Sequence, residues 1–470
     1  MSETHAIVLG GSLAGMCAAQ VLRRFFDKVT ILDRDAYHAA AEGRPGAPQA
    51  RHVHVLLQRG WIEYERLFPG FQEQMRAAGV REIDLTNELA ILRTAGWQQR
   101  VATSLTAYLM TRDRLESIVR GLLRASPKIT LREQMEVTEL VAAPRGPHGP
   151  RVAGVRAHSR LGGASLELSA DLVVDATGRT SRAPSWLRAL GVTPPEETVV
   201  DSFAGYSSRW FKAPAASKWP RDWWWKGAWI DPAPPKQLLG GVMFPVEGDR
   251  WVVTLIGYGK QYPPADAEGF SRALRELRSP VIAESVALAE PISPVYCNRA
   301  LSNRFRRYER SDERADGFVA VGDSVCVFNP INGQGMTAAV LCAGALEATL
   351  RKMTPRSPAF TGTFFRGQAK LLRDPWDLAI GSDFRFPDTV GDRPLSIPLF
   401  RVYTEALTNR MIDDPEIVLR ATEVFYMLKP NAALLDPALV RRVALGSLKS
   451  ALLRITGERQ ITSMPPTYGP

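Results

Sequence analysis

The first thirty residues show an apolar run, a glycine-rich turn, a helical pattern and a second apolar run. The segment "AIVLG" is continuously apolar, as expected of a buried parallel strand, and "GMCAAQVLRRF" carries apolar residues at helical spacing. The segment "KVTILDRD" completes the pattern and ends in acidic residues. Residues 5–33 therefore predict a compact β-α-β unit.

The rest of the chain contains regions where apolar and polar residues alternate, continuous apolar segments and helical patterns. Apolar and polar positions alternate in residues 85–110 and 199–259, which predicts antiparallel sheet. The segment "TRDRLESIVRGLLR" predicts a helix with Thr111 as its N-cap. Continuous apolar runs return in "DLVVDATGR" and "VAVGD", and the pattern after Gly344 is mainly helical, interrupted by prolines. Together these elements predict an α/β fold.

The turn "GGSLAG" places Gly10, Ser12 and Gly15 at the spacing of a dinucleotide-binding fingerprint. The first glycine permits the tight turn, and a small middle residue lets backbone N–H groups approach a pyrophosphate. The third glycine brings helix and strand close together. Ser12 stands where the fingerprint usually has glycine, while Asp33 follows at the distance expected of an acid that accepts hydrogen bonds from a ribose.

Two later buried strands also end in turns, at "DATGR" (Asp175 to Arg179) and at Gly322-Asp323. The carboxyl ends of parallel strands meet at one edge of a sheet, so we expect all three turns to converge on one crevice. Asp323 would there bind a ribose or ribityl hydroxyl. Pro330 would stiffen the turn, and the N–H groups of residues 332–335 would face a ring edge that becomes negative on reduction.

These three motifs together resemble the FAD-binding set of the p-hydroxybenzoate-hydroxylase-type (group A) FAD-dependent monooxygenases, over roughly residues 5 to 345. The resemblance implies FAD as the cofactor, with the backbone at Pro330, Asn332 and Gly333 beside the flavin edge and no assigned catalytic side chain. The predicted cofactor-binding residues are Gly10, Ser12, Leu13, Ala14, Gly15, Asp33, Arg34, Arg51, Arg112, Asp175, Gly178, Asp323, Pro330, Asn332, Gly333, Gly335 and Met336.

The same resemblance implies how the chain is divided. A Rossmann-like FAD-binding domain, discontinuous in sequence, would comprise residues 1–84, 111–195 and 296–345. An antiparallel substrate-binding sheet would be inserted into it as residues 85–110 and 196–295, and residues 346–470 would form a helical C-terminal region.

A narrower set of segments is similar to the flavin-dependent epoxidases of polyether biosynthesis, of the monensin and lasalocid type. The segments are "RPGAPQARHVHVLL", "VVDATGRTSRAPSWLRALG", "RWFKAP", "FPVEGDRW" and "RDPWDLA". This likeness implies a monooxygenase that uses NAD(P)H and O2, through a flavin C4a-hydroperoxide, to epoxidise an alkene in an apolar natural-product intermediate. Electrons would arrive directly or through a separate flavin reductase. Aromatic hydroxylation, prenyl-chain reduction and flavin binding without turnover remain alternatives.

Several conspicuous residues have both a functional and a structural interpretation. His52 and His54 lack a carboxylate or cysteine at ligand spacing, so we expect no metal site; His52 is either a cofactor-lining or a structural residue. The tryptophans of "DWWWKGAW" would wall a pocket or pack in a core. The segment "WKGAWIDP" does not match the Trp-x-Trp-x-Ile-Pro signature of flavin halogenases, which disfavours halogenation.

Composition and charge indicate which classes of binding partner to expect. The net charge is +10, from 59 Lys and Arg against 49 Asp and Glu, but the arginines are spread along the chain and form no basic module, so we expect no nucleic-acid partner. No segment approaches the roughly 18 apolar residues of a membrane span, and the first strand begins near Met1, which predicts a cytoplasmic protein. Residues 437–455 would form a basic helix that either caps a domain or contacts a membrane peripherally. The scattered cysteines predict buried, reduced thiols.

Overall fold

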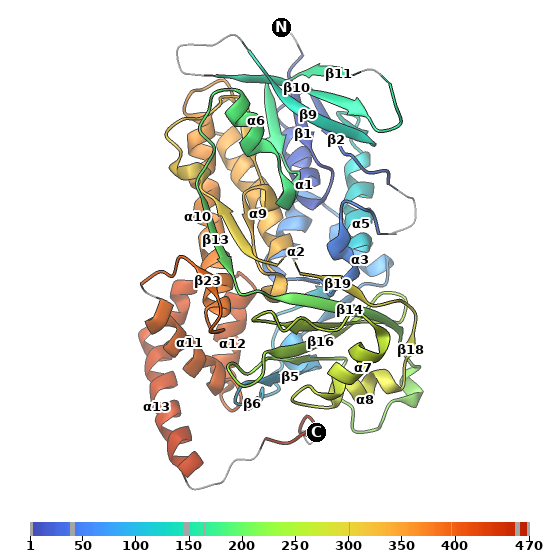
Figure 1. The fold of residues 1–470 in the computed structure, drawn as a ribbon, viewed down its shortest axis with the longest axis vertical. Coiled ribbons are helices and arrows are strands. Elements are labelled where there is room, and N and C mark those ends of the chain that lie inside the picture. The colour runs from blue at the N-terminus through green and yellow to red at the C-terminus, as the bar shows by residue number, and fades with distance from the viewer. Residues whose placement is uncertain are drawn as a thin grey trace.

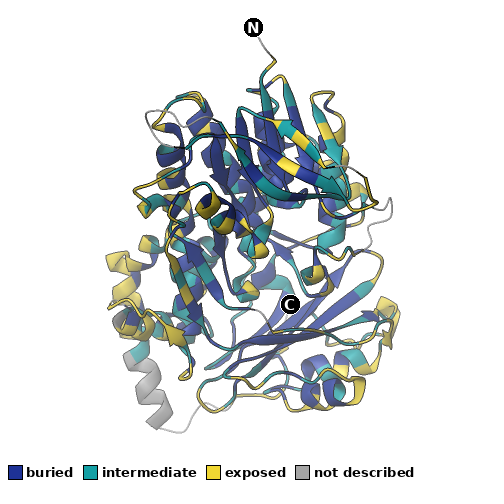
Figure 2. Cartoon of the chain, turned by 45° about the horizontal axis from the view of Figure 1, so that its top comes forward, coloured by how far each residue is buried: buried dark blue, intermediate teal, exposed yellow. Residues whose placement is uncertain are grey.

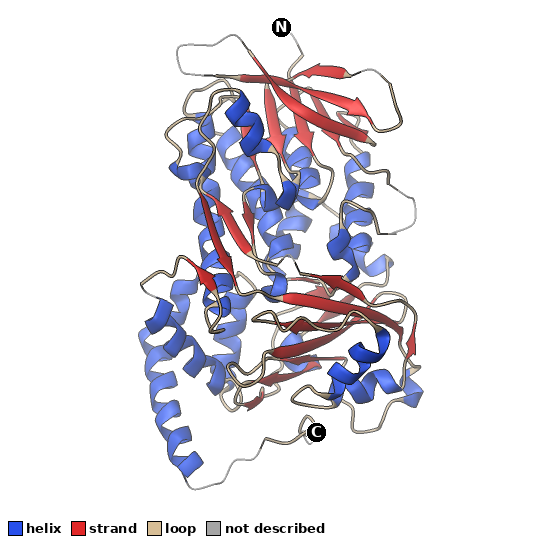
Figure 3. Cartoon of the chain, in the orientation of Figure 1, coloured by secondary structure: helices blue, strands red, loops and turns tan. Residues whose placement is uncertain are grey.

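A computed structural model describes residues 3–37, 43–143, 150–163, 165–299, 301–395, 397–455 and 461–467, without the side chains of residues 399 and 448–455. Two sheets organise the molecule along its long axis, as Figure 1 shows. A parallel sheet and its helices occupy the upper half, and an antiparallel sheet occupies the lower half, with the C-terminal helices beside it (Figure 3).

The parallel sheet has the strand order β21-β12-β1-β2-β8, and each neighbouring pair runs parallel. Its strands are β1 (His5–Leu9), β2 (Lys28–Leu32), β8 (Ile129–Arg132), β12 (Leu172–Asp175) and β21 (Phe318–Ala320). Helix α1 (Leu13–Leu22) connects β1 to β2, which confirms the predicted β-α-β unit. A meander of β9 (Met135–Ala142), β10 (Val152–Ser159) and β11 (Leu166–Ser169) packs on this sheet.

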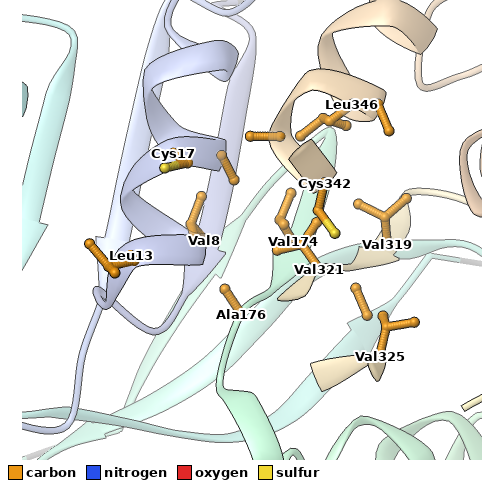
Figure 4. Packing of buried hydrophobic residues seen from close by; sticks show 14 of the residues in the cluster. Val8, Leu13, Cys17, Val174, Ala176, Val319, Val321, Val325, Cys342 and Leu346 are labelled. Carbon is orange, nitrogen blue, oxygen red and sulfur yellow. The ribbon is translucent and has the colours of Figure 1, made fainter. Parts of the chain in front are cut away.

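Helix α1 and helix α9 (Gly335–Leu350) pack on each other beside the parallel sheet, and their apolar side chains belong to one buried cluster with Val174 and Val319 (Figure 4). Both valines are 0% exposed. Full burial of an aliphatic side chain of this size stabilises a fold by about 1.5–3 kcal/mol. Cys17 on α1 and Cys342 on α9 belong to this core, whereas Cys297 is exposed, contrary to the expectation of buried thiols.

The antiparallel sheet has the order β18-β14-β17-β16-β15-β5-β6, with β19 also paired to β14. Its strands are β5 (Leu89–Arg93), β6 (Gly96–Trp97), β14 (Gly205–Lys212), β15 (Gly227–Ile230), β16 (Leu239–Val246), β17 (Arg250–Gly257), β18 (Glu290–Pro291) and β19 (Tyr296–Asn298). The pairs β14–β17 and β16–β17 are antiparallel along their full length, as the alternation predicts, although β15 and β5 pair in parallel.

Two smaller sheets join the halves. One has the order β3-β7-β4, from β3 (Val55–Leu56), β4 (Arg81–Ile83) and β7 (Ala107–Leu109). The other has the order β22-β20-β13-β23, from β13 (Glu197–Asp201), β20 (Asn303–Arg306), β22 (Cys326–Val327) and β23 (Val390–Gly391). Strands β7 and β13 therefore lie in these small sheets and not in the large antiparallel one.

The remaining helices are α2 (Gln58–Leu67), α3 (Phe71–Ala77), α4 (Leu85–Glu88), α5 (Arg112–Arg124), α6 (Ala183–Ala189), α7 (Ala267–Arg275), α8 (Val281–Ala287), α10 (Phe360–Asp383), α11 (Ile397–Arg410), α12 (Pro415–Phe425) and α13 (Pro437–Ile455). The hydroxyl of Thr111 accepts a hydrogen bond from the Arg114 N–H, so Thr111 caps α5 as predicted. Buried residues concentrate in the sheets and the helices packed on them (Figure 2).

Helix α13 caps the C-terminal helices over the part whose side chains are described. Leu439 and Val443 are buried in a cluster with residues of α11 and α12. This contact favours the capping interpretation of the basic helix. Within the described ranges, no helix is both long enough and apolar enough to cross a membrane.

The closeness of α1 to β1 leads to a stability prediction. A Cβ atom on Gly15 would stand 1.9 Å from the carbonyl oxygen of Gly10, whereas a Cβ on Gly121 of α5 meets nothing within 4 Å. Gly15→Ala is therefore expected to lower the free energy of unfolding by about 1–3 kcal/mol, because it forces helix and strand apart. Urea denaturation measures the change.

The matched control is Gly121→Ala, which adds the same methyl group to an exposed helical position. It is expected to raise the free energy of unfolding by up to about 1 kcal/mol through helix propensity. Equal stability of the two variants would contradict the close packing of α1 on β1.

Candidate functional site

The carboxyl ends of β1, β12 and β21 meet at one edge of the parallel sheet. The N–H of Ala176 donates to Leu9 O at 2.8 Å, and the N–H of Val321 donates to Asp175 O at 2.9 Å. Gly10 has a φ of +94°, and a Cβ there would lie 2.6 Å from the Ala176 carbonyl oxygen. Position 10 thus requires glycine for two reasons: its φ is positive, and a side chain there would collide with the backbone that follows β12.

A cavity of about 440 Å³ lies at this edge. The predicted cofactor-binding residues that line it are Ser12, Leu13, Ala14, Arg34, Arg112, Gly178, Asp323, Pro330, Gly333, Gly335 and Met336. All three strand-end turns contribute, so the predicted convergence on one crevice holds in the structure.

Other predicted residues lie next to the cavity and hold its walls. The Asp33 carboxylate accepts hydrogen bonds from the Gly11 N–H at 2.6 Å and the Tyr37 hydroxyl at 2.7 Å. Asp175 is fully buried, and its carboxylate accepts from Thr177 N–H at 2.9 Å and from the Ser181 hydroxyl at 2.5 Å. Both acids fix the turns that follow their strands.

The remaining predicted residues are Gly10, Gly15, Arg51 and Asn332. Gly10 and Gly15 form the contact between β1 and α1. The guanidinium of Arg51 lies 4.7 Å from the ring centre of Tyr296, and Asn332 ends the 3-10 turn Pro330–Asn332. Among the described residues, these four do not line the cavity.

Two helix N-termini open into the cavity. The first-turn N–H groups of a helix lack intrahelical partners and carry partial positive charge, and no N-cap side chain hydrogen-bonds to those of α1 or α9. A Cβ on Gly335, the first residue of α9, would meet no protein atom within 4 Å. The α1 end suits a pyrophosphate, and the open space at Gly335 suits a flat ring edge, so the residues present fit FAD.

A buried ionic cluster fixes the first turn. The Ser12 hydroxyl donates to Glu116 at 2.5 Å, and the Arg112 guanidinium donates to both Ser12 and Glu116. Arg44 pairs with Glu116 at 3.2 Å and with Asp35 at 2.6 Å. Burial by itself raises the pKa of Glu116, but the charges of Arg112 and Arg44 and the Ser12 hydrogen bond outweigh it and lower the pKa to about 2. Glu116 is therefore ionised at neutral pH.

Asp323 reaches the cavity at its polar end. The residue is exposed to the cavity, yet protein surrounds it closely, and this desolvation raises the pKa of its carboxyl above the usual value. The charges of Arg112 and Arg179 act in the opposite direction. A hydroxyl group in the cavity would supply the Asp323 carboxylate with a hydrogen-bond donor.

A second wall of the cavity is mostly apolar. It is formed by residues of the antiparallel sheet: Tyr206, Trp229, Val242, Phe244 and Ile256, with Thr254 and Asn298 as polar residues of the same sheet. Ile331, in the turn that begins at Pro330, packs against the two buried clusters that contain these side chains. The polar and apolar parts therefore meet at residues 330–333.

Sequence reasoning found the strands of this wall but not its residues. Val242 and Phe244 are two apart on β16, and Thr254 and Ile256 are two apart on β17. This period of two was visible in the sequence, but it does not tell which face of a buried sheet meets a cavity. Trp229 faces the cavity, as the pocket interpretation of the tryptophan-rich segment expects. The other tryptophans of the segment pack in a core cluster, as the core interpretation expects: Trp223, Trp224 and Trp225, with Trp219 and Trp251.

The two histidines differ in position. His52 is buried with a ring nitrogen 2.7 Å from the Ser208 hydroxyl, and it does not line the cavity among the described residues. His54 lines the cavity, and its Nδ1 lies 2.9 Å from the His52 carbonyl oxygen, which can only accept. Nδ1 therefore carries the hydrogen and Nε2 is the acceptor. Burial and the charge of Arg112 lower the pKa of His54 to about 3, so the ring is neutral at pH 7.

No group of three or more His, Cys, Asp or Glu side chains in the described ranges is arranged to hold a metal ion.

Comparison with known proteins assigns the family. The model of the family described as "FAD binding domain" matches residues 3–353. The chain belongs to this family.

One relative and two solved structures show the extent of the similarity. Protein Rv3254 of Mycobacterium tuberculosis (strain ATCC 25618 / H37Rv) is 33% identical over 400 residues, 82% of this chain and 81% of that protein. The flavin-dependent brominase Bmp2 has a TM-score of 0.65 at 13% identity, covering 95% of this chain and 100% of that one. The p-nitrophenol 4-monooxygenase PnpA from Pseudomonas putida DLL-E4 has a TM-score of 0.62 at 16% identity, covering 91% and 99%. At these identities the two structures share the fold.

The ionic cluster predicts a pH-dependent stability. Glu116→Gln removes the charge that pairs with Arg112 and Arg44, so it is expected to lower the free energy of unfolding at pH 7 by roughly 3 kcal/mol. Because the folded pKa is depressed, the difference from the unsubstituted protein should be constant above about pH 5 and shrink as pH falls through 4.5 toward 2. Urea denaturation at pH 7, 4 and 3 measures it.

The control is Glu268→Gln on α7, where the carboxylate is 90% exposed. Its effect is expected to stay within about 0.5 kcal/mol. A Glu116→Gln effect that is small at pH 7, or that does not vary with pH, would contradict the role of the cluster.

Proposed function

We propose that the chain is an FAD-dependent monooxygenase that acts on an apolar small molecule. The observation that carries the proposal is one cavity lined both by Asp323 and the starts of α1 and α9 and by a mostly apolar wall of the antiparallel sheet. A cofactor held by the polar end would present its ring to a substrate held by the wall, with the turn at residues 330–333 between them.

Each polar group of the cavity has a task in this proposal. The N–H groups at the start of α1 hold the pyrophosphate, and Asp323 holds a hydroxyl of the ribityl chain. The N–H groups at the start of α9 face the ring edge and stabilise the negative charge that it gains on reduction. Bound FAD, reduced by NAD(P)H directly or through a reductase, supplies the activation of O2 and the transfer of one oxygen atom.

The apolar wall supports epoxidation of an alkene as the reaction. Trp229, Val242 and Phe244 provide an apolar surface for the substrate, and they exclude water from the reacting atoms. An alkene needs no deprotonation to react with an electrophilic oxygen. The narrow likeness to the polyether epoxidases points the same way.

A second candidate is aromatic hydroxylation, and His54 favours it. Its neutral ring lines the cavity and has Nε2 as an acceptor, which could take a hydrogen bond from a phenol hydroxyl. The two candidate reactions predict different effects of one substitution, His54→Gln. His54→Gln should leave alkene oxidation nearly unchanged and should slow phenol oxidation.

FAD binding can be tested without a substrate. Gly335→Val places its Cβ atom in space that adjoins the cavity and has no atom of another segment within 4 Å, so thermal unfolding of the FAD-free protein should change little. FAD affinity, measured by equilibrium titration, should fall about 10- to 100-fold, because the new side chain occupies the place of the ring edge.

The control is Gly367→Val on α10, where a Cβ also meets nothing within 4 Å but lies outside the cavity. This variant should bind FAD like the unsubstituted protein. Normal FAD affinity in Gly335→Val would mean that the ring lies elsewhere.

The reaction itself is tested with isotopically labelled oxygen. The FAD-loaded protein, NADPH and 18O2 are incubated with a set of long-chain alkenes and a set of phenols, and products are analysed by mass spectrometry. The proposal predicts one labelled oxygen atom per product, with alkene epoxides as the main class. Substrate-stimulated NADPH oxidation that reduces a double bond and consumes no O2 would instead identify a reductase.

A further inference from the structure

A buried polar cluster lies directly behind the turn at residues 330–333. Asp383, the last residue of α10, is 0% exposed, and Asn303 and Asn329 are 0% and 1% exposed. The Asn303 side-chain amide donates to one Asp383 oxygen at 2.6 Å, and the Asn329 amide donates to the other at 2.8 Å. The Ser202 side chain also hydrogen-bonds to this carboxylate.

These hydrogen bonds fix the orientation of Asn329. Its Nδ2 is turned toward Asp383, so its Oδ1 faces the chain and accepts from the Ile331 N–H at 3.4 Å, capping the 3-10 turn Pro330–Asn332. The Asn329 N–H donates to Asn303 Oδ1 at 2.6 Å. Asp383 is therefore connected, through two amides, to the turn at residues 330–333.

The same end of α10 also contacts the substrate-facing wall. Asp383 lies close enough to Tyr206 and Tyr258 for its charge to add to the desolvation that raises the pKa of each phenol. Tyr206 lines the cavity. Phe386 stacks on Tyr258 with ring centres 3.7 Å apart, in a cluster that includes Tyr206.

We propose that Asp383 is a positioning residue for the cofactor site: it holds the turn at residues 330–333, and hence the start of α9, in the geometry that receives the flavin ring. This inference rests on the proposed function. Asp383 lies beyond residues 3–353, so it is a contribution of this chain's C-terminal region that the matched family region does not contain.

The protonation of Asp383 provides a specific signature. Burial raises the pKa of its carboxyl to about 7, against the hydrogen bonds from Asn329, Asn303 and Ser202, and Asp201 adds to the rise. The groups that face it are these three donors, Asp201, Tyr206 and Tyr258. The ionised carboxylate accepts from both amides at full strength, whereas protonation turns one oxygen into an O–H donor and weakens the hydrogen bond that this oxygen accepts.

The experiment is a titration of the FAD-free protein with FAD between pH 6 and 8.5, by flavin fluorescence. In the unsubstituted protein, FAD affinity should fall as pH decreases through about 7, as Asp383 takes up a proton. Asp383→Asn opposes an amide NH2 to the Asn329 NH2, so at pH 8 it should weaken FAD binding about tenfold. Its affinity should no longer change near pH 7.

The matched control is Asp388→Asn, an exposed carboxylate a few residues further along the chain. It should reproduce both the affinity and the pH profile of the unsubstituted protein. Asn329→Ser removes one of the two links from the turn side and should reduce the pH dependence, which provides the test if Asp383→Asn does not fold.

The outcomes separate the two proposals. If the unsubstituted protein binds no FAD, the proposed function and this inference both fail. If it binds FAD and the variants at positions 383 and 329 keep its affinity and pH profile, only the role of Asp383 is refuted.

Discussion

The geometry of the site depends on the parallel register of β1, β12 and β21. That register places Leu9 beside Asp175, and Asp175 beside Ala320, so three turns from distant parts of the chain begin at one level. The close contact of α1 with β1 at Gly15 then points the helix N-terminus into the space between the turns. Without this alignment, the N–H groups of α1 and α9 could not face the same cavity.

Buried charges hold the turns after the backbone has placed them. Ser12 replaces the usual middle glycine of the fingerprint, and the structure explains why this is tolerated. Its hydroxyl is engaged by Glu116 and Arg112, away from the first-turn N–H groups, which stay free for an anion. Both ionic partners come from α5, whose start is fixed by the Thr111 cap.

The sequence predicted the parts of this site that local patterns determine. Apolar runs, glycine spacing and strand-end turns identified the β-α-β unit, the convergence of the turns and most residues along the cavity. The roles of Asp33 and Asp175 were harder to predict, because an acid at the end of a strand can face a ligand or accept hydrogen bonds from its own turn. In the structure, both acids accept hydrogen bonds from nearby backbone N–H groups. Asp383 had no local signal, since its partner Asn329 is 54 positions away.

The wall of the cavity shows a second limit of sequence patterns. Alternation located β14, β16 and β17, but packing against the turn at residues 330–333 decides that Phe244 and Ile256 face the cavity. We propose that the cofactor ring lies between this wall and the start of α9, and a crystal structure of the FAD-loaded protein would test this placement. We predict the flavin ring in contact with residues 333–336 on one side and exposed to Trp229 and Phe244 on the other. A ring bound outside this cavity would refute the placement.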